Sequence, residues 1–185
     1  MLAAAMGFAG CAGTDSAVGS GVGGSARPVA SGGAGDVADP FAPGGVSIFP
    51  LTQLQLDDQG EPWLLLFLEL QDRWGDPVKA VGWLTVYLEP EGRPGSVSDH
   101  EARWDIDLTD ASVNSALFDP VTRTYRVQLG GLPGRAVPMA HRSEQRRAGG
   151  DAEGVKGAMV FRAMFRTRGE SGDELELWDT FRLES

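Results

Sequence analysis

Few residues in this sequence have the chemistry or the spacing that catalysis needs. Cys11 is the only cysteine among 185 residues, which excludes an internal disulfide and a cysteine-based zinc cluster. The two histidines, His100 and His141, have no histidine partner at i+3 or i+4, and no G-x-S-x-G motif is present. The residues of a Ser-His-Asp triad can lie far apart in sequence, so the absence of a local motif does not exclude such a triad. We predict no catalytic residue, no metal site and no cofactor, and we expect the chain not to be an enzyme.

Two acidic groups could offer oxygen atoms to a cation. The stretch 57–61, DDQGE, lacks the alternating acidic positions of an EF-hand loop and is interpreted as a polar turn. Asp105, Asp107 and Asp110 form the second group, and the first two share one face of a predicted strand. A cation at a sheet edge is the functional interpretation of this group, and a solvated outer face is the structural one.

Aromatic and basic side chains are better candidates for ligand binding. Trp63, Trp83 and Trp104 fall at alternating positions that predict a place in the core. Trp74 lies in a turn-like stretch, and Trp178 lies on the strand face opposite its apolar neighbours. Both rings are candidates for the surface, where an aromatic ring can stack on a sugar, and the alternative for Trp178 is that it covers the second face of its sheet.

The segment 134–154, GRAVPMAHRSEQRRAGGDAEG, is basic within an acidic chain. We interpret it as a long loop between two strands, with contact to an anionic partner or polymer as the functional alternative. The candidate ligand-binding residues are therefore Trp74, Trp178, Arg142, Arg146 and Arg147.

The overall charge excludes one class of partner. The chain has 26 acidic and 16 basic residues, a formal net charge of −10. A nucleic-acid-binding protein meets phosphates with a basic face, so we predict that this chain binds no nucleic acid. Hydrophobic residues make up 42% of the sequence, which is enough to build a folded core.

Short runs with period-two alternation would position the candidate residues. Strands are predicted at 63–71, 80–89, 102–108, 124–129, 158–168 and 174–183, with one or two weaker ones within 46–56. The first two of the six are expected to form a hairpin, and so are the last two. Thr109 or Asp110 could cap a short helix within 109–118. No long helices alternate with the strands, so the predicted fold is all-β, an antiparallel β-sandwich that is immunoglobulin-like or similar.

The first eleven residues, MLAAAMGFAGC, are apolar and end in small residues. They are too short to span a membrane, and they are typical of the end of a secretory signal. The stretch Phe8-Ala9-Gly10-Cys11 resembles the lipobox of bacterial lipoproteins. The resemblance implies cleavage before Cys11 and acylation of that cysteine as the new N-terminus. A plain cleavable signal and an unprocessed apolar N-terminus are the alternatives.

The composition after Cys11 predicts a tether. Gly, Ala and Ser dominate up to residue 45 and offer too little apolar surface to offset the entropy of ordering the chain. We therefore divide the sequence into a signal-peptide remnant (1–10), a lipidated, disordered tether (11–45) and a β-sandwich domain (46–185) that carries the basic loop. Tyr125, near the start of a strand, is similar to the tyrosine corner of immunoglobulin-like domains. The stretches LQDRWGDPVKAVG and FDPVTRTY make the domain similar to small bacterial β-sandwich lipoproteins.

The lipobox resemblance implies a cell-envelope protein that is anchored to a lipid bilayer through acylated Cys11, with its domain outside the cytoplasm. We expect a non-catalytic binding or structural role, with an envelope protein or a polysaccharide as partner. A carbohydrate- or peptide-binding β-sandwich module is the alternative.

Overall fold

The computed structural model describes residues 42–90, 100–149, 157–169 and 172–184. The predicted signal-peptide remnant, Cys11 and nearly all of the predicted tether lie outside the described residues. The first strand of the described chain starts at Gly45.

The described chain forms two antiparallel sheets. The first sheet has the order β1-β3-β8-β7, with β2 and β4 also paired to β3. Its strands are β1 (Gly45–Ile48), β2 (Gln53–Leu56), β3 (Pro62–Gln71), β4 (Pro77–Val78), β7 (Phe118–Asp119) and β8 (Thr124–Leu129). The second sheet has the order β10-β9-β5-β6. Its strands are β5 (Trp83–Leu88), β6 (Ala102–Asp107), β9 (Ala158–Arg168) and β10 (Glu174–Glu184).

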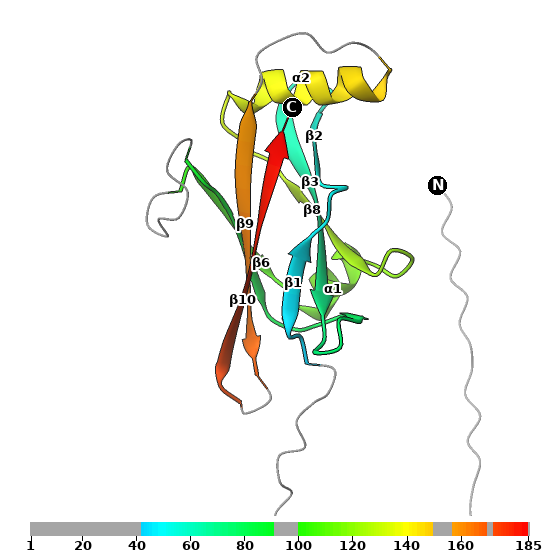
Figure 1. The fold of residues 1–185 in the computed structure, drawn as a ribbon, viewed down its shortest axis with the longest axis vertical. Coiled ribbons are helices and arrows are strands. Elements are labelled where there is room, and N and C mark those ends of the chain that lie inside the picture. The colour runs from blue at the N-terminus through cyan, green and yellow to red at the C-terminus, as the bar shows by residue number, and fades with distance from the viewer. Residues whose placement is uncertain (1–41, 91–99, 150–156, 170–171, 185) are drawn as a thin grey trace, which may run out of the picture. The chain divides into compact units, whose positions relative to one another are not determined.

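The two sheets pack face to face around one apolar core, which confirms the predicted all-β sandwich (Figure 1). Alternation explains the packing, because every second side chain of a strand points to the same face. Leu64, Leu66, Leu68 and Leu70 of β3 are fully buried in this way. They meet inward side chains of the other sheet, which include Leu84, Val86, Leu88, Phe161 and Phe165.

A side-chain hydrogen bond connects the two sheets along each of the two open edges of the sandwich. On one side β1 lies against β10, and the backbone N–H of Ile48 donates to Asp179 Oδ2 at 2.6 Å. On the other side Trp104 of β6 donates its indole N–H to the carbonyl of Gly130, just after β8, at 2.8 Å. A side chain therefore links the sheets at both sides.

The short helix α1 (Ala111–Leu117) begins as the sequence predicted. Asp110 is its N-cap, and the carboxylate accepts hydrogen bonds from the backbone N–H groups of Ser112 and Val113. The helix places Asn114 in the interior, where its amide donates to the carbonyls of Ala80 and Leu108 at 2.8 and 2.7 Å.

Tyr125 completes this interior network. Its hydroxyl accepts from the N–H of Ala80 and lies 3.2 Å from Asn114 Oδ1. Burial raises the pKa of the Tyr125 phenol. The resemblance to a tyrosine corner is therefore partial, because the hydroxyl binds backbone 45 positions upstream in sequence rather than a few residues away.

The predicted hairpin between 63–71 and 80–89 is wrong, because β3 and β5 belong to different sheets. Strand β3 has partners on both sides, so no place beside it is left for β5. The chain instead turns at Gly75, pairs briefly as β4 with Leu70 and Gln71, and then crosses to the second sheet.

The predicted basic loop contains a helix, α2 (Ala136–Arg147), which lies across one end of the sandwich in Figure 1. Ala136, Met139 and Ala140 are buried at helical spacing, and the helix packs on β2. Positions 150–154 of the predicted loop lie outside the described residues.

Candidate functional site

The outer face of the second sheet gathers aromatic and charged side chains from all four strands. The register places Trp83, Thr85 and Tyr87 of β5 on one face with their cross-strand partners. Those partners are Asp107, Asp105 and Arg103 on β6, and Arg166, Met164 and Arg162 on β9, with Glu176, Trp178 and Thr180 following on β10. We call this set of residues the aromatic face.

Trp83 is the most exposed aromatic ring of the aromatic face, and the prediction that it lies in the core is wrong. Its side chain is 46% exposed, whereas Leu84 beside it is fully buried. Alternation separates the two faces of a central strand but does not say which face another layer covers. Trp178 is 41% exposed on the same face, so the two tryptophans flank β9.

Tyr87 fixes the position of the Trp178 ring at the end of the aromatic face away from Trp83. Its ring stacks with that of Trp178 at 6.5 Å between centroids and an interplanar angle of 17°. The His100 ring meets it edge-on at 5.0 Å. The guanidinium of Arg162 lies 5.8 Å from the Trp178 centroid, and that of Arg103 lies 5.7 Å from the Tyr87 centroid. These neighbours leave Tyr87 itself almost fully buried.

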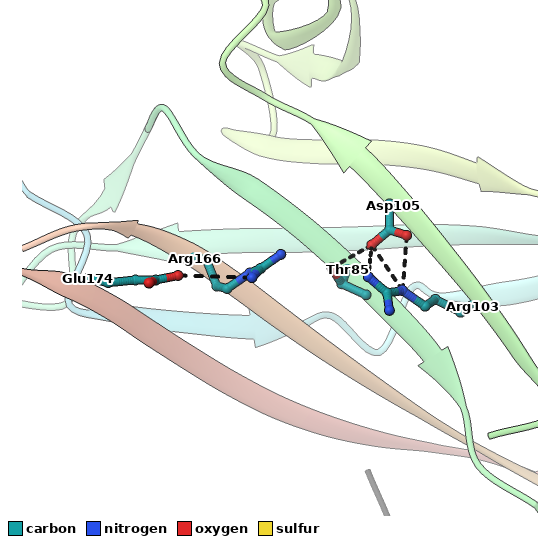
Figure 2. A network of polar contacts seen from close by, with 5 residues as sticks. All are labelled: Thr85, Arg103, Asp105, Arg166 and Glu174. Atoms are coloured by element: carbon teal, nitrogen blue, oxygen red, sulfur yellow. Dashed lines mark hydrogen bonds and ion pairs between the residues drawn. The ribbon is translucent and has the colours of Figure 1, made fainter. Parts of the chain in front are cut away.

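A polar network crosses the same face (Figure 2). Asp105 of β6 accepts from Thr85 Oγ1 at 2.8 Å and from the Arg103 guanidinium at 2.8 to 3.1 Å. The hydrogen bond from Arg103 is the main reason that the pKa of Asp105 lies below its usual value, and Thr85 lowers it further. The same pair raises the pKa of Arg103.

Arg166 is held more loosely than Arg103. Its Nη1 lies 3.9 Å from Glu174 Oε1, beyond hydrogen-bond distance, and Figure 2 shows it between that carboxylate and the Asp105 group. Its buried Nε has no hydrogen-bond partner within the described part of the chain. The Arg166 guanidinium can therefore exchange its present contacts for those of a ligand at little cost.

A depression of about 880 Å³ lies at the Trp83 end of the aromatic face. Its lining combines apolar and polar groups, which include Val81, Trp83, Thr109, Arg166, Arg168 and Glu174. Val81 is 64% exposed there, so the wall beside the Trp83 ring is also apolar. A flat apolar surface ringed by hydrogen-bonding side chains suits a ligand that has both properties.

Gly82 allows the backbone just before Trp83 to lie against β9, and this close approach positions Trp83 in the depression. A Cβ atom at Gly82 would lie 2.3 Å from the carbonyl oxygen of Arg166 and 2.6 Å from the Phe165 ring. Only glycine fits such an approach of backbone to backbone. The Gly82 carbonyl also accepts from the N–H of Leu108 at 2.9 Å, which fixes the end of β6.

The structure does not bring the five predicted ligand-binding residues together. Trp178 lies on the aromatic face, while Trp74 is 60% exposed in the turn between β3 and β4 of the other sheet, with Arg73 above its ring at 4.4 Å. The three arginines are on α2. Arg142 is 6% exposed, and Arg147 donates to the carbonyl of Leu54 at 2.8 Å, so both contribute to docking the helix on the first sheet. Arg146 is exposed in the last turn of α2.

Two signals in the sequence could have improved the prediction. The spacing of Ala136, Met139 and Ala140 indicates an amphipathic helix, and Gly149, which adopts a φ of 77°, is a typical helix-terminating residue. For Trp83 the sequence gave no such signal, because Val81 and Tyr87 make its strand face look apolar as well. The pairing of β5 with β9, which brings Arg166 beside Trp83, joins distant positions and has no local signal.

The acidic groups also have structural roles. Asp57 Oδ1 accepts from the N–H groups of Gln59 and Glu61, which makes 57–61 a turn. Asp107 Oδ1 accepts from the N–H of Thr109. Across residues 42–90, 100–149, 157–169 and 172–184, no group of three or more His, Cys, Asp or Glu side chains is arranged to hold a metal ion. None of the helices in those ranges has the length and apolar character needed to cross a membrane.

Comparison of the chain with protein-family models, with curated proteins and with solved structures finds no match. What the aromatic face binds must therefore be inferred from its own residues.

Proposed function

We propose that this chain is a non-catalytic binding module that is tethered to a membrane and holds a neutral saccharide on the aromatic face. The observation that supports it best is the exposed Trp83 ring in a depression that is lined by Arg166, Arg168 and Glu174. Pyranose rings present an apolar C–H face and a rim of hydroxyl groups, so they match an aromatic ring surrounded by donors and acceptors.

The spacing of the two exposed tryptophans favours an extended ligand. Trp83 is on β5 and Trp178 is on β10, with β9 between them. Along the strand direction, Trp178 lies two residues from Glu176, the residue of β10 that is level with Trp83. Strand spacing and rise put their Cα atoms roughly 12 Å apart. Two tryptophans whose Cα atoms are this far apart can each stack on a sugar of one short oligosaccharide, with Arg166 on the intervening strand β9 to bind hydroxyl groups.

The charges of the aromatic face favour a neutral ligand over an acidic one. Its arginines face carboxylates: Arg103 pairs with Asp105, and Arg162 pairs with the buried Glu89 at 2.8 Å. Arg166 lies near Glu174, and Glu176 is its cross-strand partner. An anionic sugar would have to displace these carboxylates, whereas a neutral sugar can use both kinds of side chain as hydrogen-bond partners.

The direct test is titration of the full chain with neutral oligosaccharides, namely cellopentaose, maltopentaose and chitopentaose, followed by tryptophan fluorescence and calorimetry. We expect at least one of them to bind, and Trp83→Ala and Trp178→Ala each to weaken binding by about two- to tenfold, since stacking on a ring contributes about 0.5–1.5 kcal/mol. Trp74→Ala is the matched control, because it removes an exposed tryptophan from the other sheet. If no neutral oligosaccharide binds, or if Trp74→Ala weakens binding as much as Trp83→Ala, the proposed function is wrong.

The tether needs a separate test. The lipobox-like FAGC motif and the Gly/Ala/Ser-rich sequence after it support a cell-envelope location with Cys11 acylated. Mass analysis of membrane-extracted protein should give a mature chain that begins at Cys11 and carries acyl chains. A Cys11→Ala variant that stays in the membrane fraction in unchanged amount would refute the anchor.

A further inference from the structure

One edge of the first sheet is only partly covered. Strand β8 pairs with β3 along residues 125–129, but on its other side β7 pairs only with Thr124 and Tyr125. The chain before β7 is the helix α1 and cannot continue the pairing. Within the described part of the chain, residues 126–129 therefore have a strand partner on one side only.

A groove of about 630 Å³ runs along this edge. One wall faces the gap between the sheets and is apolar, with Ile106, Leu117 and Phe118. The other wall lies on the outer face of the first sheet, where Leu65 is paired with Gln128. Ile106 belongs to β6, which is itself the last strand of the second sheet, so the groove lies between two sheet edges.

We infer that this groove binds an extended peptide of a partner protein, added as a strand beside residues 126–129 of β8. Unpaired N–H and C=O groups along a strand edge are complementary to the backbone of another extended chain. Side chains of the added strand would alternate between the two walls. One set would enter the apolar gap beside Ile106 and Leu117, and the other would lie over Leu65 and Gln128, so the peptide should be apolar at alternate positions.

The net charge of the chain favours a peptide of another protein over a second copy of this chain as the occupant of the groove. The formal net charge of −10 makes two copies repel each other and attracts a basic partner. At the rim of the groove Arg126 lies 3.7 Å from Asp119, so the charge of this arginine is already balanced. The occupant that fits is a basic peptide with small apolar residues at every second position.

The test uses the full chain labelled with ¹⁵N and the capped peptide acetyl-Lys-Thr-Val-Thr-Val-Thr-Lys-amide as the probe. We expect saturable shifts of backbone amide signals in residues 117–119 and 126–129. A peptide that is N-methylated at alternate residues keeps its side chains but loses the donors on one edge. We expect it to bind about tenfold more weakly or not at all, because the interaction depends on backbone pairing.

Two variants on α1 complete the design. Ala116 is exposed and lines the groove, so Ala116→Trp should fill it and weaken binding of the first peptide by about tenfold or more. Ala111→Trp places the same side chain on an exposed position of the same helix away from the groove, and it should bind as the wild type does.

Three results of the peptide titrations would overturn the inference. They are the absence of saturable shifts, equal binding of the N-methylated peptide, and equal binding by Ala116→Trp. Peptide-free dimerisation that shifts the same amides would also overturn it, because the occupant would then be a second copy. The saccharide test measures the effect of substituting Trp83 and Trp178, which are on the second sheet. The saccharide proposal and the peptide proposal can therefore fail independently.

Discussion

The polar network around Asn114 and the one around Asp105 use similar hydrogen bonds in opposite surroundings. Asn114 and Tyr125 are buried, and each of their bonds to the backbone of Ala80 or Leu108 is 2.7 to 3.1 Å long. Asp105 accepts hydrogen bonds of 2.8 to 3.1 Å from Thr85 and Arg103, but the side chains of Asp105 and Arg103 are more than 40% exposed. Geometry alone therefore does not distinguish the two networks.

The difference in surroundings determines what each network can do. An interior hydrogen bond that is broken leaves a buried polar group without water, which costs about 1–3 kcal/mol per group. On the surface, water replaces a lost partner, so an ion pair contributes about 0–1 kcal/mol. The interior network can thus fix α1 against both sheets, whereas the surface network can release its partners to a ligand.

Removing Asn114 should give the largest effect. Asn114→Ala removes the amide donor of the Leu108 carbonyl and one of the two donors to the Ala80 carbonyl, and it opens a cavity beside Tyr125. We expect a loss of about 3 kcal/mol or more in the free energy of unfolding, measured by urea titration. Ser115→Ala, on the exposed side of the same helix, should change it by less than about 0.5 kcal/mol. Equal losses in the two variants would show that the helix, and not the buried amide, sets the stability.

Gly82 lies between the interior network and the aromatic face, so its substitution should affect both stability and binding. Its carbonyl binds the N–H of Leu108, whose own carbonyl binds Asn114, and the next residue is Trp83. Gly82→Ala forces a Cβ into the backbone of β9, and we expect a loss of about 2–3 kcal/mol. Saccharide binding should fall as well, because Trp83 is displaced. A stable variant with unchanged tryptophan fluorescence would contradict the close approach.

Tyr125→Phe should show how the interior network depends on pH. The variant leaves the N–H of Ala80 without its acceptor, and we expect a loss of about 1–2 kcal/mol near pH 7. The raised pKa of Tyr125 means that the unfolded chain ionises first as the pH increases. The stability that the phenol contributes is present in full below its unfolded pKa near 10 and is lost as the pH rises through the folded value. Urea titrations at pH 9 and 11 should therefore find a smaller difference between variant and wild type at pH 11, and a constant difference would contradict this.

Alternation in the sequence predicted the fold class and most strand boundaries, because the side-chain period of a strand is local. The start of α1 was predicted for the same reason, since Asp110 caps it within three residues. The placement of β3 and β5 in different sheets was not predicted, because it depends on which distant strand occupies each edge of β3. Alternation found one of the two exposed tryptophans of the candidate site, since it made Trp178 a candidate for the surface. It assigned Trp83 to the core, because the sequence of a strand does not show which of its two faces stays uncovered.

Asp105→Asn should have the smallest effect and tests the surface half of the comparison. The substitution removes a charge that pairs with Arg103, but both side chains are more than 40% exposed, so solvent screening limits the loss to about 0.5 kcal/mol at pH 7. The lowered pKa of Asp105 means that its contribution is present above the unfolded pKa near 4 and disappears as the pH falls through the folded value. Thermal melts of wild type and variant should therefore differ by about 2 °C or less at pH 7 and converge at pH 2–3. A loss as large as that of Tyr125→Phe would mean that the surface network holds the sheet together and is not free to exchange its partners for a ligand.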